Sequence, residues 1–260
     1  QQEFNLMTQT SGKINTAAAK TGEEGRQMSI WEHVNELRKR LFRAVIGLVL
    51  TTTISFSIAS KLLEMLAVPI GGLGKLQSIE ITENMGVYMK VSLLSGFIFA
   101  LPYILYQLLA FIMPGLKPGE KRWVIMAIPL ATLLFVIGVA FSYFVMLPAA
   151  IPFLTNFLGI TTTPRLSNYF NFMTNLMFWI GVAFEAPLVV FVLAKLRLVS
   201  AKALLKQWRI AIVVIAVMAA LITPTVDPVN MGLLMLPLFL IYLLSAIFAW
   251  LARRNEENGI

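Results

Sequence analysis

Most of this sequence consists of long runs that contain no charged residue or only one. The runs are 91–116, 123–164, 166–194 and 210–252, of which the third contains only Glu185 and the fourth only Asp227. Crossing about 30 Å of hydrocarbon takes roughly 20 apolar residues, so each run is long enough for a transmembrane helix, and the two longest for two. Charged residues make up 13% of the chain, against about 25% in a soluble domain. We therefore expect an integral membrane protein.

Six transmembrane helices account for these runs and for an apolar segment nearer the start. We expect them at Ala44–Ser60, Val87–Pro114, Trp123–Leu147, Tyr169–Leu196, Ile210–Ile222 and Val229–Trp250. The spans are helices because each backbone group must be satisfied within its segment, and the alternating pattern of a membrane barrel is absent. Prolines inside four spans predict kinks: Pro102, Pro129, Pro187 and Pro237. The predicted fold class is an all-α polytopic membrane protein.

The distribution of Lys and Arg predicts the orientation. Fifteen of them lie between residue 26 and the first span, in the connections after the second and fourth spans, or after the sixth. The opposite side holds only four, which are Lys61, Lys75, Lys90 and Arg165. Basic residues are retained on the cytoplasmic side, so both termini are expected there. Residues 1–27 are expected to be a disordered polar tail, 28–252 the membrane domain and 253–260 a cytoplasmic tail.

The residues offer little for catalysis or for nucleic-acid binding. His33 is the only histidine, cysteine is absent, and no phosphate-binding Gly-Lys-Ser/Thr loop occurs. A nucleophilic triad, a histidine-rich zinc site and an ATP motor are therefore excluded, and no metal or cofactor is expected. The net charge of +8 follows from the basic residues along the membrane edges, so it is no nucleic-acid footprint.

The segment before the first span predicts an amphipathic helix. Ser29 and Glu32 have the spacing of a capping box, so a helix should begin here. Its apolar positions form one stripe, made of Trp31, Val34, Leu37 and Leu41. We expect a helix that lies at the cytoplasmic interface before the chain turns inward. Glu36 is on its polar side, where an ion pair with Arg40 four residues on is the simple interpretation.

Three more acidic positions stand out, each with an ordinary alternative. Glu120 follows two Pro-Gly pairs and falls in the first turn of the third span, where the helix dipole alone would favour it. Glu185 lies inside the fourth span, where a carboxylate indicates function, although a buried hydrogen-bonded role is the alternative. Asp227 follows a fifth span of only 13 residues, which is about 20 Å long. We expect Asp227 in a hydrated recess below the membrane surface, the alternative being an ordinary Asp-Pro turn.

Together these features resemble the TatC family, the multispanning receptor component of the twin-arginine protein translocase, over nearly the whole chain after Met28. The motifs that carry the resemblance are His33 to Arg40 (His-x-x-Glu-Leu-Arg-x-Arg), Glu120-Lys121-Arg122 after Phe111, Phe184 to Pro187 (Phe-Glu-x-Pro), and Thr223 to Pro228 (Thr-Pro-x-x-Asp-Pro). Pro69 also matches a family position. Asn230 departs from it, because the family usually carries Gln there.

The resemblance implies a receptor in the cytoplasmic membrane that binds the paired-arginine signal peptides of folded proteins. It would recruit single-span partners of the TatA and TatB type, with export driven by the proton-motive force. The implied signal-peptide residues are Glu36, Arg38, Phe111, Glu120, Lys121 and Arg122. The implied partner-contact or intramembrane polar residues are Pro69, Glu185, Asp227 and Asn230. Arg suits bidentate recognition by carboxylates, which agrees with Glu36 and Glu120 as acceptors.

Two other functions are compatible with parts of the sequence. A proton-coupled transporter of small solutes would use Glu185 and Asp227 as a relay, but it leaves Glu36 and Glu120 without a role. A purely structural assembly subunit is the second. Neither predicts that a paired-arginine signal peptide crosslinks to this protein.

Overall fold

The computed structural model describes residues 30–115, 118–155, 163–195, 198–223 and 228–257. For residues 30, 115, 118–124, 229–230 and 253–257 it describes the backbone only. The chain forms two compact units, residues 1–42 and 43–260. Nearly all described residues are helical, and β pairing among them is limited to an isolated bridge between Gln77 and Arg165. The all-α fold class is confirmed.

The first helix, α2, runs without interruption from Ile30 to Phe56. An interfacial helix followed by a turn was expected here, and the turn is absent. The physical reason is that residues 30–56 contain no proline, so every backbone N–H can continue the helical ladder. Ser29 lies outside the described residues, so the predicted start of this helix stays a prediction.

The chain bends by 75° between α2 and the next helix, α3 (Ala59–Ala67). Two short 3-10 turns follow, η1 (Val68–Ile70) and η2 (Leu73–Lys75). Gly71 and Gly72 between them have φ of 93° and 97°, in the left-handed region that glycine adopts without strain. The first span was predicted to reach Ser60. It ends at Phe56 instead, and much of the connection is helical.

The remaining helices overlap the predicted spans, but residues 147–155 are also helical, although the third span was predicted to end at Leu147. They are α4 (Glu83–Ile112), α5 (Pro118–Phe141), α6 (Leu147–Thr155), α7 (Leu166–Phe184), α8 (Ala186–Lys195), α9 (Ala201–Lys206), α10 (Trp208–Ile222) and α11 (Pro228–Glu257). A 3-10 turn, η3 (Met113–Gly115), ends α4, and a π-helical turn, η4 (Ser142–Met146), joins α5 to α6. Helix α9 was not predicted. It begins at the N-cap Ser200, whose Oγ accepts a hydrogen bond from the Ala203 N–H at 3.1 Å.

Within the part of the chain that the structure describes, four helical segments are long and apolar enough to cross a membrane: Glu83–Ile112, Ile125–Thr155, Leu166–Lys195 and Met231–Ala252. The bent pair of α2 and α3 raises the number to five if it counts as one span. Helix α10 is apolar but has only 15 residues, about 22 Å at 1.5 Å per residue. The chain is a polytopic membrane protein, and the count of six spans stays a prediction.

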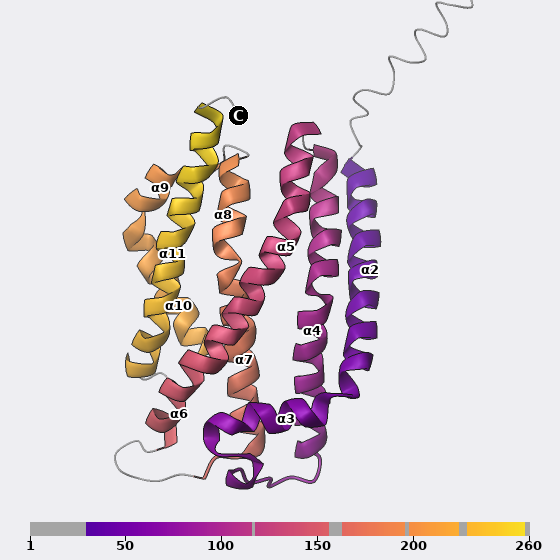
Figure 1. Cartoon of the computed structure of the whole chain (residues 1–260), viewed down its shortest axis with the longest axis vertical. Coiled ribbons are helices and arrows are strands. Elements are labelled where there is room, and N and C mark those ends of the chain that lie inside the picture. Colours follow the sequence, from indigo (N-terminus) through magenta and orange to yellow (C-terminus); the bar gives the residue numbers. More distant parts are fainter. Residues whose placement is uncertain (1–29, 116–117, 156–162, 196–197, 224–227, 258–260) are drawn as a thin grey trace, which may run out of the picture. The chain divides into compact units, whose positions relative to one another are not determined.

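Within residues 43–260 the helix ends gather at two opposite levels (Figure 1). One level holds the end of α4, the start of α5, the end of α8, α9 and the end of α11. The other holds α3, the end of α6, the start of α7 and the end of α10. This grouping is consistent with the two sets of connections that the Lys and Arg count separates. The orientation itself stays a prediction, and we name the second level the extracytoplasmic end after it.

Helix α7 lies at the centre of the core of this unit. Its fully buried residues lie along one face, at Phe170, Met173, Leu176 and Ile180, and it packs against α4 and α5. Helix α8 packs mainly against α11. Lipid tails are as apolar as these side chains, so close van der Waals packing and interhelical hydrogen bonds hold membrane helices together. An example is Thr51 of α2, whose hydroxyl donates to the Gly96 carbonyl of α4 at 2.8 Å.

Tyrosine hydroxyls hold the extracytoplasmic end together. Tyr88 donates to the Phe56 carbonyl at the end of α2 at 2.6 Å. Tyr143 and Tyr169 donate to the Met65 and Leu66 carbonyls in the last turn of α3, at 2.7 and 2.8 Å. A carbonyl oxygen can accept two hydrogen bonds, so each hydroxyl adds a contact between helices at a helix end, and the Met65 carbonyl also accepts from the Val68 N–H. They fix α3 to the segment after α5 and to α7.

Candidate functional site

Glu36 forms the ion pair with Arg40 that its spacing predicts. The Arg40 Nε and Nη2 donate to the same carboxylate oxygen, Oε1, at 2.9 and 2.6 Å. The second oxygen, Oε2, accepts no hydrogen bond from any described residue. Glu36 thus holds a guanidinium already and keeps one oxygen unused. Arg38 lies nearby on α2 with an exposed side chain.

The corner between α4 and α5 brings two further predicted residues to one end of the second unit. Phe111 lies in the last turn of α4 and is half-buried. Pro118 opens α5, which puts Glu120 in its first turn as predicted, followed by Lys121 and Arg122. The side chains of the last three residues lie outside the described part, so their contacts stay predictions. Whether Glu36 meets Glu120 also stays a prediction, because Glu36 belongs to the first unit.

Glu185 lies at a break within the fourth predicted span. Helix α7 ends at Phe184 and α8 begins at Ala186, and the two together form one apolar segment of 30 residues. The break is explained by Pro187, which has no N–H to donate to the Ala183 carbonyl. Glu185 Oε1 is buried and has no hydrogen-bond partner among the described residues. Ten residues, about 15 Å along the helix, separate it from Lys195, so it lies at membrane depth.

A close helix crossing fixes the segment just before Glu185. A Cβ added to Gly138 of α5 would lie 3.0 Å from the Gly181 Cα of α7 and 2.9 Å from the Phe184 Cγ. A Cβ added to Gly181 would lie 2.7 Å from the ring of Phe135. Only glycine allows the two backbones to approach this closely, as is usual where membrane helices cross. The crossing positions Glu185 one residue beyond Phe184.

The other predicted intramembrane residues differ in what the structure shows of them. Pro69 lies in η1, directly after α3, and is half-buried. Asp227 lies outside the described residues. Asn230 is in the first turn of α11, but its side chain is not among those described. The short fifth span before Asp227 is present as α10.

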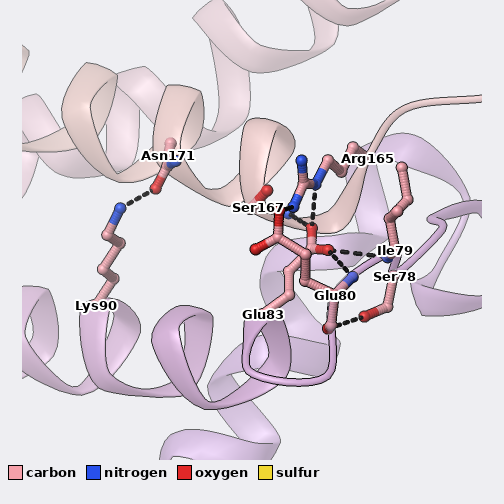
Figure 2. A network of polar contacts seen from close by, with 8 residues as sticks. All are labelled: Ser78, Ile79, Glu80, Glu83, Lys90, Arg165, Ser167 and Asn171. Carbon is pink, nitrogen blue, oxygen red and sulfur yellow. Dashed lines mark hydrogen bonds and ion pairs between the residues drawn. The ribbon is translucent and has the colours of Figure 1, made fainter.

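Sequence reasoning missed a buried carboxylate, Glu83, in the first turn of α4. Its side chain is 1% exposed, and it accepts four hydrogen bonds (Figure 2). Oε1 accepts from the Ser167 N–H at 2.6 Å and the Arg165 Nε at 3.1 Å, and Oε2 accepts from the N–H groups of Ile79 and Glu80 at 2.9 and 3.3 Å. One carboxylate therefore joins the start of α4 to the start of α7.

Arg165 completes this cluster with a second carboxylate, Glu80, at 2.7 Å. Hydrogen bonds to Glu80 and Glu83 raise the pKa of the Arg165 guanidinium above its ordinary value. One signal of this cluster was present in the sequence: Glu80, Glu83 and Arg165 all flank predicted spans on the same side of the membrane. The pairing of residues 82 positions apart could not be read from that signal.

Comparison with known proteins identifies the family. Residues 32–237 match the family model described as Sec-independent protein translocase protein (TatC). The chain is 34% identical over 239 residues to the TatC protein of Carboxydothermus hydrogenoformans, which covers 91% of this chain and 98% of that protein. The chain belongs to the TatC family. The TatC protein of Aquifex aeolicus is 36% identical over 240 residues, covering 89% of this chain and 98% of its own length.

The fold agrees with that membership. A structure described as the crystal structure of the twin-arginine translocase receptor TatC superimposes with a TM-score of 0.76 at 35% identity. It covers 85% of this chain and the whole of the other. The chain is thus a multi-pass membrane component of the Sec-independent, twin-arginine translocase, and TatC proteins are translocase components and not enzymes. Because the chain belongs to the TatC family, the alternative interpretation of Glu185 and Asp227 as a proton relay for solute transport has no support.

Proposed function

We propose that this protein is the receptor subunit of the translocase and binds paired-arginine signal peptides at its cytoplasmic face. In this proposal Glu36 and Glu120 accept the two signal arginines, with Arg38, Phe111, Lys121 and Arg122 close to them. The setting is the cytoplasmic membrane. Single-span partners of the TatA and TatB type are recruited afterwards, and the proton-motive force drives export of the folded substrate.

The main support for the proposal is that the Glu36 carboxylate is already paired with a guanidinium group. Its carboxylate already binds a guanidinium fork, that of Arg40, through Oε1 alone. An ion pair between residues four apart on a helix contributes only about 0.2–0.5 kcal/mol, so an incoming arginine can displace Arg40 at small cost. The other oxygen, Oε2, is buried and accepts no hydrogen bond from a described residue, so the exchange of guanidinium groups takes place at Oε1. Arg40 thus holds the carboxylate ready for a ligand of its own chemical type.

The two signal arginines can account for only part of the affinity of a signal peptide. A charge-assisted hydrogen bond contributes about 1.5–3 kcal/mol, so two pairings give about 3–6 kcal/mol before entropic costs. Micromolar binding takes about 8 kcal/mol. The apolar core of the signal peptide must supply the remainder by contact with the membrane helices. Replacing Arg by Lys in the signal should weaken binding although the charge is kept, because the planar fork is lost.

The intramembrane polar residues are assigned to partner binding. A carboxylate at the depth of Glu185 costs at least about 2.5 kcal/mol in lipid, and no described residue satisfies its Oε1. We assign Glu185 to contact with a partner transmembrane helix in a water-bearing concavity. Pro69, Asp227 and Asn230 complete this set, and the shortness of α10 supports a hydrated recess around Asp227.

Photocrosslinking tests the receptor assignment. A signal peptide with a photoreactive residue beside its paired arginines is expected to crosslink to the parent protein in membranes. The double variant Glu36→Ala, Glu120→Ala is expected to lose most of that product and to remain folded. Glu64→Ala is the matched control, since Glu64 is an exposed carboxylate of α3 that the proposal leaves out. Equal crosslinking of the double variant and the control would refute the assignment.

A second variant separates recognition from a role in helix stability. Arg40→Gln removes the resident guanidinium but leaves the Glu36 carboxylate in place. Displacement predicts that signal-peptide binding is kept or becomes tighter in this variant. If Arg40→Gln weakens crosslinking as strongly as Glu36→Ala does, the ion pair serves the helix and Glu36 is no acceptor for the signal.

A further inference from the structure

A narrow apolar groove of about 350 Å³ lies between α10, α8 and α11. Helix α10 lines it with one face, because its lining residues recur along the helix, as Ile210, Val214, Met218 and Ile222 do at intervals of four. Of these four only Ile222 is buried. Helix α10 packs mainly on α11, so the face that it turns toward α8 is largely unpacked.

The hydroxyl groups inside the groove are already hydrogen-bonded. Tyr242 donates to the Leu204 carbonyl, and the Ser245 hydroxyl donates to the Ile241 carbonyl at 2.8 Å. The third polar lining residue, Gln207, is the N-cap of α10 and lies at the mouth of the groove, where α9 meets α10 (Figure 1). A polar group inside the groove would lose its hydrogen bonds to water without replacement, so the occupant is apolar.

The dimensions of the groove distinguish between apolar occupants. The lining of α10 runs from Gln207 to Ile222, about 22 Å along the helix, and that of α11 from Leu238 to Ser245, about 10 Å. These lengths bracket the depth of one leaflet, about 15 Å, which is half of the hydrocarbon thickness. A helical segment 15 Å long and 10 Å wide occupies about 1,200 Å³, which is far more than the groove holds. A single acyl chain is slender enough to enter, and a transmembrane helix is not.

The groove is continuous with the surface of α10 that faces the lipid. Ile210 and Val214 line the groove and are 61% and 54% exposed, and Val213 and Val217 beside them are exposed as well. An acyl chain of the bilayer can therefore enter the groove from the side. An empty groove would forfeit the dispersion contacts of its walls, which favours a filled one.

The mouth of the groove is surrounded by positive charge. Lys206 and Arg209 lie within two residues of Gln207, and both side chains are exposed. Neither forms an ion pair with a described residue. The sequence holds no acidic residue at positions 186–226, and the first one of α11 comes eleven residues, about 17 Å, after the last lining residue. The charge at the mouth complements the phosphate of a phospholipid.

We propose that this groove binds one phospholipid of the bilayer, with an acyl chain along α10 and the phosphate beside Lys206 and Arg209. The chain supplies the packing that α10 lacks toward α8. The inference goes beyond signal-peptide recognition and does not depend on it, because it uses none of the residues assigned to the signal peptide or to a partner helix.

Native mass spectrometry of the protein purified in a mild detergent tests the proposal. The parent is expected to retain one phospholipid per chain. Ala211→Phe and Met218→Trp each fill the groove, and each is expected to lower the retained lipid by at least about fivefold, because chain and side chain then compete for one space. Ala220→Phe changes an exposed alanine of α10 outside the groove and is expected to retain the lipid. Equal retention by the filled variants and Ala220→Phe would overturn the proposal.

Thermal unfolding separates the loss of lipid from a loss of fold. Phosphatidylcholine added to the delipidated parent is expected to raise its unfolding temperature, whereas glycerophosphocholine, the headgroup without chains, is expected to leave it unchanged. The two filled variants are expected to unfold at or above the delipidated parent and to gain nothing from added lipid. An equal effect of the headgroup alone would overturn the proposal. Unfolding of both filled variants below the delipidated parent would also overturn it.

Photocrosslinking identifies the occupant in membranes. A photoreactive residue at position 218, in the wall of the groove, is expected to capture phospholipid. Capture of a polypeptide in its place would show that a partner helix occupies this site and would contradict the proposal.

Discussion

Substitution of Gly138 by Ala should separate α5 from α7. The resulting loss of stability can be worked out from the structure. The added Cβ would lie 3.0 Å from the Gly181 Cα and 2.9 Å from the Phe184 Cγ. One of these atoms is backbone and the other is the root of an aromatic ring, so neither can move away by a simple rotation. The two helices must shift apart, and α7 carries Glu185 at its end.

The magnitude results from two opposing contributions. Overpacking in a close-packed site costs about 1–3 kcal/mol. Replacing Gly by Ala inside a helix gains about 0.5–1 kcal/mol, which partly conceals that cost. Gly232 of α11 provides the matched control, because a Cβ there meets no atom within 4 Å. Both variants gain the same helix propensity from Gly→Ala. The difference between their free energies of unfolding therefore measures the cost of the clash at Gly138, about 1–3 kcal/mol.

Thermal unfolding of the two variants in the same detergent measures this difference. One kcal/mol corresponds to about 2–4 °C in a chain of 150–250 residues, so Gly138→Ala should melt about 2–12 °C below Gly232→Ala. Gly232→Ala itself should melt at or slightly above the parent. The reasoning is refuted if Gly138→Ala melts at the temperature of Gly232→Ala or above it.

Three other predictions concern the buried carboxylates and the orientation. Glu83→Gln, which keeps the shape but removes the charge that Arg165 and three N–H groups engage, should lower the unfolding temperature clearly, whereas the exposed control Glu64→Gln should not. Glu185→Ala should impair export more than signal-peptide crosslinking, with Glu185→Gln milder, and normal export by the Ala variant would show that the carboxylate is merely tolerated. In intact cells an impermeant thiol reagent should label a cysteine placed at Gly74 and spare one at Gly119; the reverse pattern would overturn the orientation.

Some features could be predicted because neighbouring residues decide them. The ion pair of Glu36 with Arg40 depends only on helical spacing, and the structure confirms it. The position of Glu120 in the first turn of α5 is set by the Pro-Gly pairs before it, and is confirmed for the backbone. The turn expected after the amphipathic segment was wrong, because no residue between Ile30 and Phe56 interrupts the helix.

The sequence by itself determined that the chain is helical and crosses a membrane, because the bilayer acts on each segment separately through its length, charge and backbone hydrogen bonds. It also determined the family motifs. Only the tertiary structure decided how Glu83 joins the starts of α4 and α7, how three tyrosines hold the bent segment α3, and how one face of α10 comes to line an open groove. These features depend on residues far apart in the chain that meet only when the helices pack, and no local pattern specifies which residues will meet.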